Sequence, residues 1–227
     1  MTNAPAASTP DLRGAGCDPR PRRAGRDVRN PDPPWPAQPR RGHDRGARRA
    51  IRTRAAADTG LNRSNVGGWH SATDMLDWGG PAAAKLADLA IKAAKRLSHF
   101  EDRDPATVEW TIRMWANVSP PGALNMSHAH PGVLWAAVYY VDMGSPPADG
   151  DPGGELFFED PRFPVPLMRL PGFRLKGVDG QPQPVEQRLL TRAGDLVLFP
   201  AWVRHGVRPH HGTGDRISIA MNIDVKG

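Results

Sequence analysis

The feature that most constrains the fold is a change in hydrophobic pattern near residue 108. Before it, residues 81–100 carry apolar side chains at three- and four-residue steps, which predicts one amphipathic helix. After it, short apolar segments alternate with glycine- and proline-rich loops, at 107–118, 133–141, 155–158, 185–190, 195–199, 203–207 and 216–223. This order predicts a mainly β protein with an N-terminal helical segment, built as a jelly-roll or cupin-like barrel of two antiparallel sheets.

The first quarter of the chain differs in composition from the rest. Residues 1–54 hold 13 Arg against 5 Asp, a net charge of +8, whereas residues 55–227 hold 17 Lys and Arg against 19 Asp and Glu, a net charge of −2. Nine prolines, five glycines and one aromatic residue in 1–54 predict a disordered Arg/Pro-rich tail, because such a segment buries little apolar surface. Two interpretations stay open, an arm that neutralises nucleic-acid phosphates and an artefact of the assigned start site. We expect the folded domain at 61–224 and no nucleic-acid binding outside the tail.

Composition also excludes several classes of protein. The longest apolar run, Val133–Val141, is far shorter than the roughly 20 residues of a membrane-spanning helix. The single cysteine, Cys17, excludes an internal disulfide framework and a cysteine-based zinc site. The N-terminus has no apolar segment typical of a secretory signal. We therefore expect a cytoplasmic protein with no membrane partner.

Histidines at three positions are candidate metal ligands. His128 and His130 stand two residues apart, so on an extended strand both side chains point to the same face and can converge on one ion. A third ligand must come from elsewhere in the fold. The best candidate is His205, which follows the apolar strand and proline break of residues 195–200.

A candidate anion site lies eleven residues after His205. Alternation along the last strand places Arg216 and Ser218 on one face. An arginine that faces a barrel interior stays protonated and needs an anionic partner. An inward Arg-Ser pair beside a histidine cluster is an arrangement suited to a carboxylate.

These residues together resemble the 2-oxoglutarate/Fe(II)-dependent oxygenases, and most closely a bacterial branch with uncharacterised members. The resemblance covers roughly residues 61–224. The motifs that carry it are Ser64–Ser71, His128–Gly132, Tyr139–Val141, Asp160–Arg162 and Arg216–Ile219, together with the distal His205.

The resemblance implies a double-stranded β-helix that holds Fe(II) and 2-oxoglutarate. His128, His130 and His205 would be the iron ligands, and Arg216 with Ser218 would bind the distal carboxylate of 2-oxoglutarate. Tyr140 matches a position that contacts this cosubstrate in related enzymes, and Asn117 is a further candidate. The implied reaction consumes dioxygen, releases succinate and CO₂, and most commonly hydroxylates a substrate.

One position departs from the family pattern. The usual triad is two histidines and one carboxylate, whereas His130 stands where an acid is expected. Three readings follow: an all-histidine site, which we favour, a site completed by Glu155 or Asp160, or a site that no longer hydroxylates.

The remaining histidines have no predicted role in the site, and other functions are compatible with the same residues. We expect His70, in a Gly-Gly-Trp loop, to be solvated rather than at the pocket mouth, and His210 and His211 to be exposed. The alternative functions are a cupin-type metal enzyme or binding protein that does not use 2-oxoglutarate, and a non-catalytic module. The substrate, a small molecule or a peptide, is not named by the sequence. The oligomeric state stays open, with a homodimer as the expectation.

Overall fold

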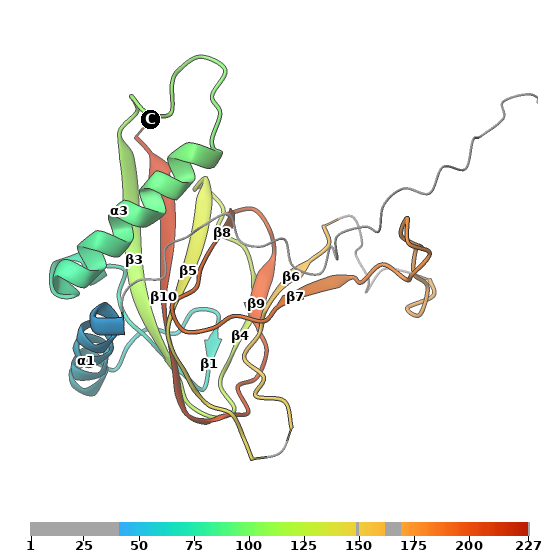
Figure 1. Ribbon diagram of the computed structural model, residues 1–227, viewed down its shortest axis with the longest axis horizontal. Coiled ribbons are helices and arrows are strands. Elements are labelled where there is room, and N and C mark those ends of the chain that lie inside the picture. Colours follow the sequence, from blue (N-terminus) through green and yellow to red (C-terminus); the bar gives the residue numbers. More distant parts are fainter. Residues whose placement is uncertain (1–40, 149, 162–168, 227) are drawn as a thin grey trace, which may run out of the picture. The chain divides into compact units, whose positions relative to one another are not determined.

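Two antiparallel sheets form the body of the protein. The computed structural model describes residues 41–148, 150–161 and 169–226, and in this part every strand pairing is antiparallel. The minor sheet contains, in order, β1 (Asn65–Val66), β4 (Leu124–His128), β9 (His205–Val207), β6 (Leu156–Glu159) and β7 (Glu186–Leu189). The major sheet contains β2 (Trp69–His70), β3 (Trp110–Ser119), β10 (Thr213–Val225), β5 (Trp135–Ser145) and β8 (Leu196–Pro200). The predicted mainly β, double-sheet architecture is confirmed (Figure 1).

Strand β10 is the centre of the major sheet, with β3 on one side and β5 on the other. Its odd-numbered apolar residues, among them Ile217 and Ile219, belong to the core beneath the helices. The even-numbered residues therefore face the space between the two sheets, because side chains alternate along a strand. An irregularity on the β5 side, between Ile217 and Ser218, sets Ser218 opposite Tyr140, so that both side chains face inward.

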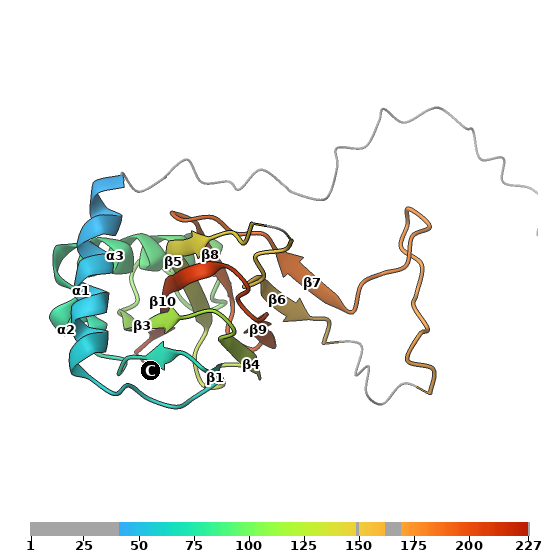
Figure 2. The same ribbon diagram turned by 90° about the horizontal axis from the view of Figure 1, so that it is seen from below.

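The helices cover the outer face of the major sheet. Helix α3 (Gly80–Leu97) has a proline in its first turn, where no backbone donor is lost, and ends at Ser98 in an extended conformation. Its alanine- and leucine-rich face packs into the same core as the outward residues of β10. The predicted helix at 81–100 is confirmed, ending three residues early. The short helix α2 (Met75–Trp78) precedes it, and Figure 2 shows these helices gathered on one side of the strands.

The prediction of disorder for residues 1–54 is wrong for 41–54, while residues 1–40 lie outside the described residues. Helix α1 (Arg41–Ala57) buries Ala47 and Ile51, one turn apart, in the helix-covered core. Arg48 and Arg52, on its exposed side, form ion pairs of 3.0 and 2.8 Å with Asp142 and Asp215. Arginine and alanine are both good helix formers, so the segment suits a helix. Its arginine-dominated composition nevertheless led to the prediction of disorder. The folded domain therefore begins before residue 61.

A second apolar cluster lies between the sheets. It comprises Ala136, Leu156, Phe199 and Ala201, packed by half-buried aliphatic and aromatic neighbours. This cluster fills only part of the interior. The remaining space is a cavity of about 490 Å³ lined by both sheets, and every predicted site residue except Tyr140 lines it. No helix in the described ranges combines the length and apolar character that a membrane span requires.

Candidate functional site: a three-histidine cluster facing a buried arginine

Neighbouring strands of the minor sheet bring the three predicted histidines together. His128 ends β4 and His205 begins β9, and the two stand opposite each other in the antiparallel pairing. His130 lies beyond the end of β4, so the prediction that both histidines share one strand is wrong. The strand stops there because Pro131 and Gly132 form a turn, with Gly132 at a φ of +83°. The backbone N–H of His130 instead donates to the carbonyl of Ala201 at 2.9 Å.

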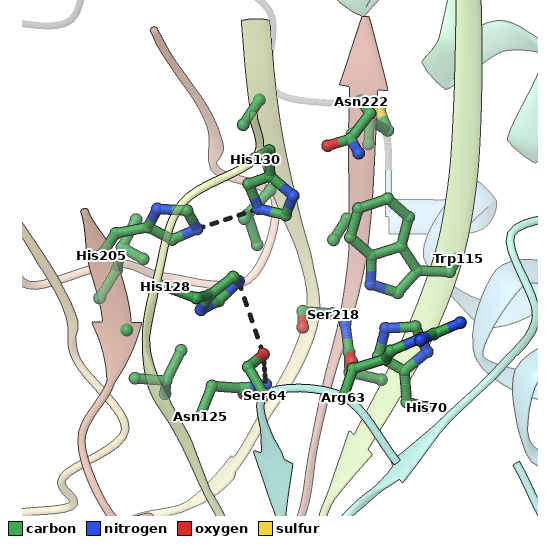
Figure 3. A pocket seen from close by; sticks show the side chains of 18 of the residues that line it. Arg63, Ser64, His70, Trp115, Asn125, His128, His130, His205, Ser218 and Asn222 are labelled. Carbon is green, nitrogen blue, oxygen red and sulfur yellow. Dashed lines mark hydrogen bonds between the residues drawn. The ribbon is translucent and has the colours of Figure 1, made fainter. Parts of the chain in front are cut away.

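The imidazole nitrogens of these histidines converge on one point. One nitrogen from each ring lies within 4.8 Å of the others, and Nε2 of His130 is 3.3 Å from Nε2 of His205. In Figure 3 the three rings face a common space, from the end of β4, the turn after it and the start of β9. This donor set and spacing fit a transition-metal ion such as iron.

Backbone carbonyls fix the tautomers of two of these rings. Nδ1 of His128 lies 2.8 Å from the carbonyl oxygen of Met126, and Nδ1 of His205 lies 2.9 Å from that of Val203. A carbonyl oxygen can only accept a hydrogen bond, so each Nδ1 carries the proton and each Nε2 presents a lone pair to the cluster. Such outer contacts are typical of metal-binding histidines.

The environment keeps the cluster neutral. Burial, with the charges of the neighbouring rings, lowers the pKa of His130 to about 4. Burial also lowers the pKa of His205 to about 4 and shifts that of His128 downward. Neutral imidazole is the form that binds metal, so the rings are in the ligating form at neutral pH.

No carboxylate joins the cluster among the residues that the structure describes. Glu155 is buried, but its carboxylate lies 3.7 Å from Nη1 of Arg188, and it does not line the cavity. Asp160 does not line the cavity either. The geometry therefore brings together the all-histidine set and neither of the acids considered as replacements.

Arg216 lies inside the barrel, on the inner face of β10. Only 1% of its surface is exposed, and its Nε and Nη2 atoms have no hydrogen-bond partner among the described residues. The guanidinium carbon lies 5.0 Å from the centre of the Tyr140 ring. Burial lowers its pKa from the ordinary value, although an arginine remains charged. A buried cation with two free donors calls for an anion at this position.

Polar groups surround this arginine without satisfying it. Ser218 and Asn117 are paired across β10 and β3, and both are buried and line the cavity. Oδ1 of Asn117 and the hydroxyl of Tyr140 have no hydrogen-bond partner in the described residues, and burial raises the pKa of Tyr140. The four residues expected to bind a cosubstrate thus lie at one end of the inner face of the major sheet, and Arg216, Asn117 and Tyr140 have unused hydrogen-bonding capacity.

Two of the expected exposed histidines are buried. His70 stacks on Trp115 with ring centres 5.6 Å apart, and its Nδ1 donates to the carbonyl of Ser71 at 2.6 Å. It lines the cavity, so its expected solvation is wrong. His210 is also buried, with Nε2 3.1 Å from the carbonyl of Gly214, whereas His211 is exposed as predicted.

Sequence reasoning missed three further residues of the cavity, namely Arg63, Arg113 and Asn222. The signal for two of them was available. Alternation from Asn117 along β3 puts Arg113 on the same face, and alternation from Arg216 along β10 does the same for Asn222. Arg63 lies in an irregular segment, where no periodicity points to the cavity.

Comparison with known protein families identifies the family that this site resembles. The family model described as "Putative 2OG-Fe(II) oxygenase" matches residues 113–222, a range that contains the histidine cluster and Arg216. Residues 113–222 thus match the 2OG-Fe(II) oxygenase family. A cupin-type enzyme without 2-oxoglutarate is not favoured by this match, and a comparison with proteins of curated function finds no match.

Solved structures of low sequence identity share the fold of this chain. A prolyl-4-hydroxylase from Pseudomonas putida is similar at 21% identity over 83% of this chain and 89% of its own, with a TM-score of 0.52. HygX from Streptomyces hygroscopicus, solved with nickel and 2-oxoglutarate, is similar at 16% identity, covering 81% and 78%, with a TM-score of 0.54. A Trichoplax adhaerens prolyl hydroxylase in complex with a peptide of hypoxia inducible factor is similar at 13% identity over the same shares, with a TM-score of 0.53. At these identities the likeness establishes the double-stranded β-helix fold.

Proposed function

We propose that this oxygenase holds Fe(II) with His128, His130 and His205, and binds 2-oxoglutarate through Arg216. The observation that carries the proposal is the buried arginine with two unpartnered nitrogens, in the same cavity as three convergent imidazoles. When bound, Fe(II) and 2-oxoglutarate together supply the oxidising chemistry that consumes dioxygen, releases succinate and CO₂, and hydroxylates a substrate.

The dimensions of the inner face support this assignment. Trp115 is paired with Ala220 on β10, and its ring centre lies 5.9 Å from that of His130. The histidine cluster therefore stands near the level of Ala220, four residues and about 13 Å along the strand from Arg216. The long arginine side chain shortens this gap, leaving room for a small elongated dianion with one end at each site.

Each protein group has a defined role in this proposal. The guanidinium of Arg216 forms charge-assisted hydrogen bonds to the distal carboxylate, and the hydroxyls of Ser218 and Tyr140 donate to the same group. The amide of Asn117 supplies a further hydrogen bond inside the cavity. The carbonyl contacts at Nδ1 of His128 and His205 keep both rings oriented with Nε2 free.

Anaerobic titration of the Fe(II)-loaded protein with 2-oxoglutarate tests the cosubstrate assignment. We expect the weak visible absorption of an Fe(II)–oxo acid chelate to saturate in the wild type and to require far more 2-oxoglutarate in Arg216→Ala. The matched control is Arg49→Ala, which removes an exposed arginine of α1. No chelate absorption in the wild type, or equal affinity in Arg216→Ala, would contradict the proposal.

Iron content after desalting tests the ligand set. We expect one Fe(II) per chain in the wild type and in Glu155→Ala, and strongly reduced iron in single alanine variants of the three histidines. Full iron in His130→Ala would show that another group completes the site.

The remaining expectations from the sequence are also proposals. We propose a cytoplasmic location, supported by the single cysteine of the chain, and a homodimer, which light scattering can test. The intact mass of the endogenous protein determines whether residues 1–54 are part of it.

A further inference from the structure

The cavity has a one-sided charge. Its described lining residues include three arginines, Arg63, Arg113 and Arg216, and no aspartate or glutamate. The protein therefore contributes only positive formal charge to this space.

Arg113 lies too far from Arg216 to bind the same small molecule. Along β10 and β3, Arg216 pairs with Ser119 at one end of the inner face, and Asn222 pairs with Arg113 at the other. Six residues of strand separate Arg216 from Asn222, about 20 Å. Trp115, which contacts His130, lies between these ends. Arg113 is thus on the opposite side of the histidine cluster from the proposed 2-oxoglutarate site.

Groups at this second end lack partners. Arg113 forms no ion pair with a described residue, whereas Arg204 outside the cavity is 3.0 Å from Glu159. Oδ1 of Asn222 is buried without a hydrogen-bond partner in the described part of the chain. Figure 3 shows Asn222 beyond one edge of the Trp115 ring and Arg63 beside His70, towards the other.

A count of charges shows that 2-oxoglutarate does not neutralise the cavity. Its two negative charges offset the two positive charges of Fe(II), which leaves the arginines uncompensated. A triad with one carboxylate would remove a further positive charge, but no carboxylate joins this cluster among the described residues. Arg113 is exposed to solvent at the edge of the cavity, where this excess of positive charge attracts a second anion.

We propose that the substrate of this oxygenase is a small organic anion, a carboxylate or phosphate ester on an apolar body, bound by Arg113. The apolar body lies against Trp115, close to the histidine cluster, and the amide of Asn222 hydrogen-bonds a polar substituent. Guanidinium groups bind carboxylate and phosphate through the same paired donors. This inference rests on the proposed function, because 2-oxoglutarate must occupy Arg216.

The test uses probes that share one apolar body and differ in charge. Full-length protein is loaded with Ni(II), which does not support turnover, and saturated with 2-oxoglutarate so that Arg216 is occupied. Calorimetry then measures binding of 3-phenylpropionate, 2-phenylethyl phosphate, 3-phenylpropionamide and 3-phenylpropylamine. We expect one or both anions to bind at least about tenfold more tightly than the amide, and the amine to bind most weakly. The tighter of the two anions identifies the charged group.

Variants locate the anion. We expect Arg113→Gln to lower the preference for the anion over the amide by about tenfold, and Arg113→Lys to retain part of it, because lysine keeps the charge without the paired donors. Arg49→Gln, the same change at an exposed position of α1, should leave the preference unaltered. A preference unchanged in Arg113→Gln would overturn the assignment to that residue, even if Arg63→Gln abolished it.

Failure of this inference is distinguishable from failure of the proposed function. If the Fe(II)-loaded wild type forms the 2-oxoglutarate chelate but no anion binds, or the anions and the amide bind equally, only the anionic substrate is refuted. If no chelate forms, the proposed function is refuted first.

Discussion

Replacing Arg216 by methionine should change stability and cosubstrate binding in opposite directions. Arg216 is 1% exposed, and its Nε and Nη2 lack partners among the described residues. Exchanging a buried, poorly compensated ion for an apolar side chain of similar length commonly stabilises a protein by about 1–4 kcal/mol. We therefore expect the free energy of unfolding of metal-free Arg216→Met to exceed that of the wild type by an amount in this range.

The same substitution should abolish useful affinity for 2-oxoglutarate. Two charge-assisted hydrogen bonds at about 1.5–3 kcal/mol each amount to a loss of roughly a hundredfold or more in affinity. Wild-type metal-loaded protein should gain about 2.7 kcal/mol of stability at 2-oxoglutarate concentrations one hundred times its dissociation constant. Arg216→Met should gain almost nothing at the same concentration.

Urea unfolding with and without 2-oxoglutarate measures both effects on one sample. Arg49→Met is the control, because an exposed arginine should change stability by less than about 0.5 kcal/mol. Clear destabilisation of the metal-free protein by Arg216→Met would refute the reasoning, since it would mean that the arginine is compensated without the cosubstrate. An unchanged response to 2-oxoglutarate would refute its role as the carboxylate anchor.

Three further predictions concern the helix, a glycine and pH. Ile51→Ala should lower the free energy of unfolding by about 2–5 kcal/mol in urea titrations, because Ile51 is fully buried; no loss would show that α1 is not part of the core. Gly154→Ala should weaken 2-oxoglutarate binding in the chelate titration, because a Cβ at this position, where φ is +72°, would lie 3.1 Å from Cδ of Arg216. Gly122→Ala controls for backbone strain, since Gly122 has a φ of +85° and open space around it. Equal affinities in the two variants would contradict a steric effect on Arg216. The pKa of about 4 for His130 and His205 lies below the ordinary 6.5. As the pH falls from 6.5 to 4, the unfolded chain therefore takes up protons on these rings that the folded chain does not. The free energy of unfolding of the metal-free protein should fall over this range by at most about 1.4 kcal/mol per pH unit for each ring. The urea midpoint of a variant with both rings replaced by phenylalanine should change less over this pH range than that of the wild type. An equal fall in the two proteins would contradict the assignment of the pH dependence to His130 and His205.

The sequence predicts the strands that carry chemistry better than it predicts their surroundings. Alternation along a strand depends only on backbone geometry, so the inward direction of Arg216 and Ser218 could be predicted without knowing the fold. The meeting of His205 with His128 could be inferred as a third ligand, but the pairing of β4 with β9 is a tertiary feature that no local pattern contains.

Burial of His70 could not be predicted for a related reason. It lies on β2, a strand of two residues that follows two glycines, and so short a strand has no alternating pattern that would mark a buried face. Its burial comes from Trp115, forty-five positions later, against which its ring stacks. Helix α1 was not predicted for a local reason. Its two buried apolar residues are outnumbered by arginines, which suit a solvated helix face as well as a disordered segment.

Strand β10 carries both the proposed cosubstrate anchor and a polar group at the substrate end, and it is hydrogen-bonded to β3 and β5 along most of its length. The distance between these two ends is therefore fixed by the rise per residue of a paired strand rather than by loop conformation. Strand β10 thus sets the spacing between the two ends inside the barrel. Engineering a longer or shorter substrate into this enzyme should thus succeed through side-chain size at the proposed substrate end, whereas a one-residue insertion or deletion within 216–222 would reverse the facing of every residue beyond it.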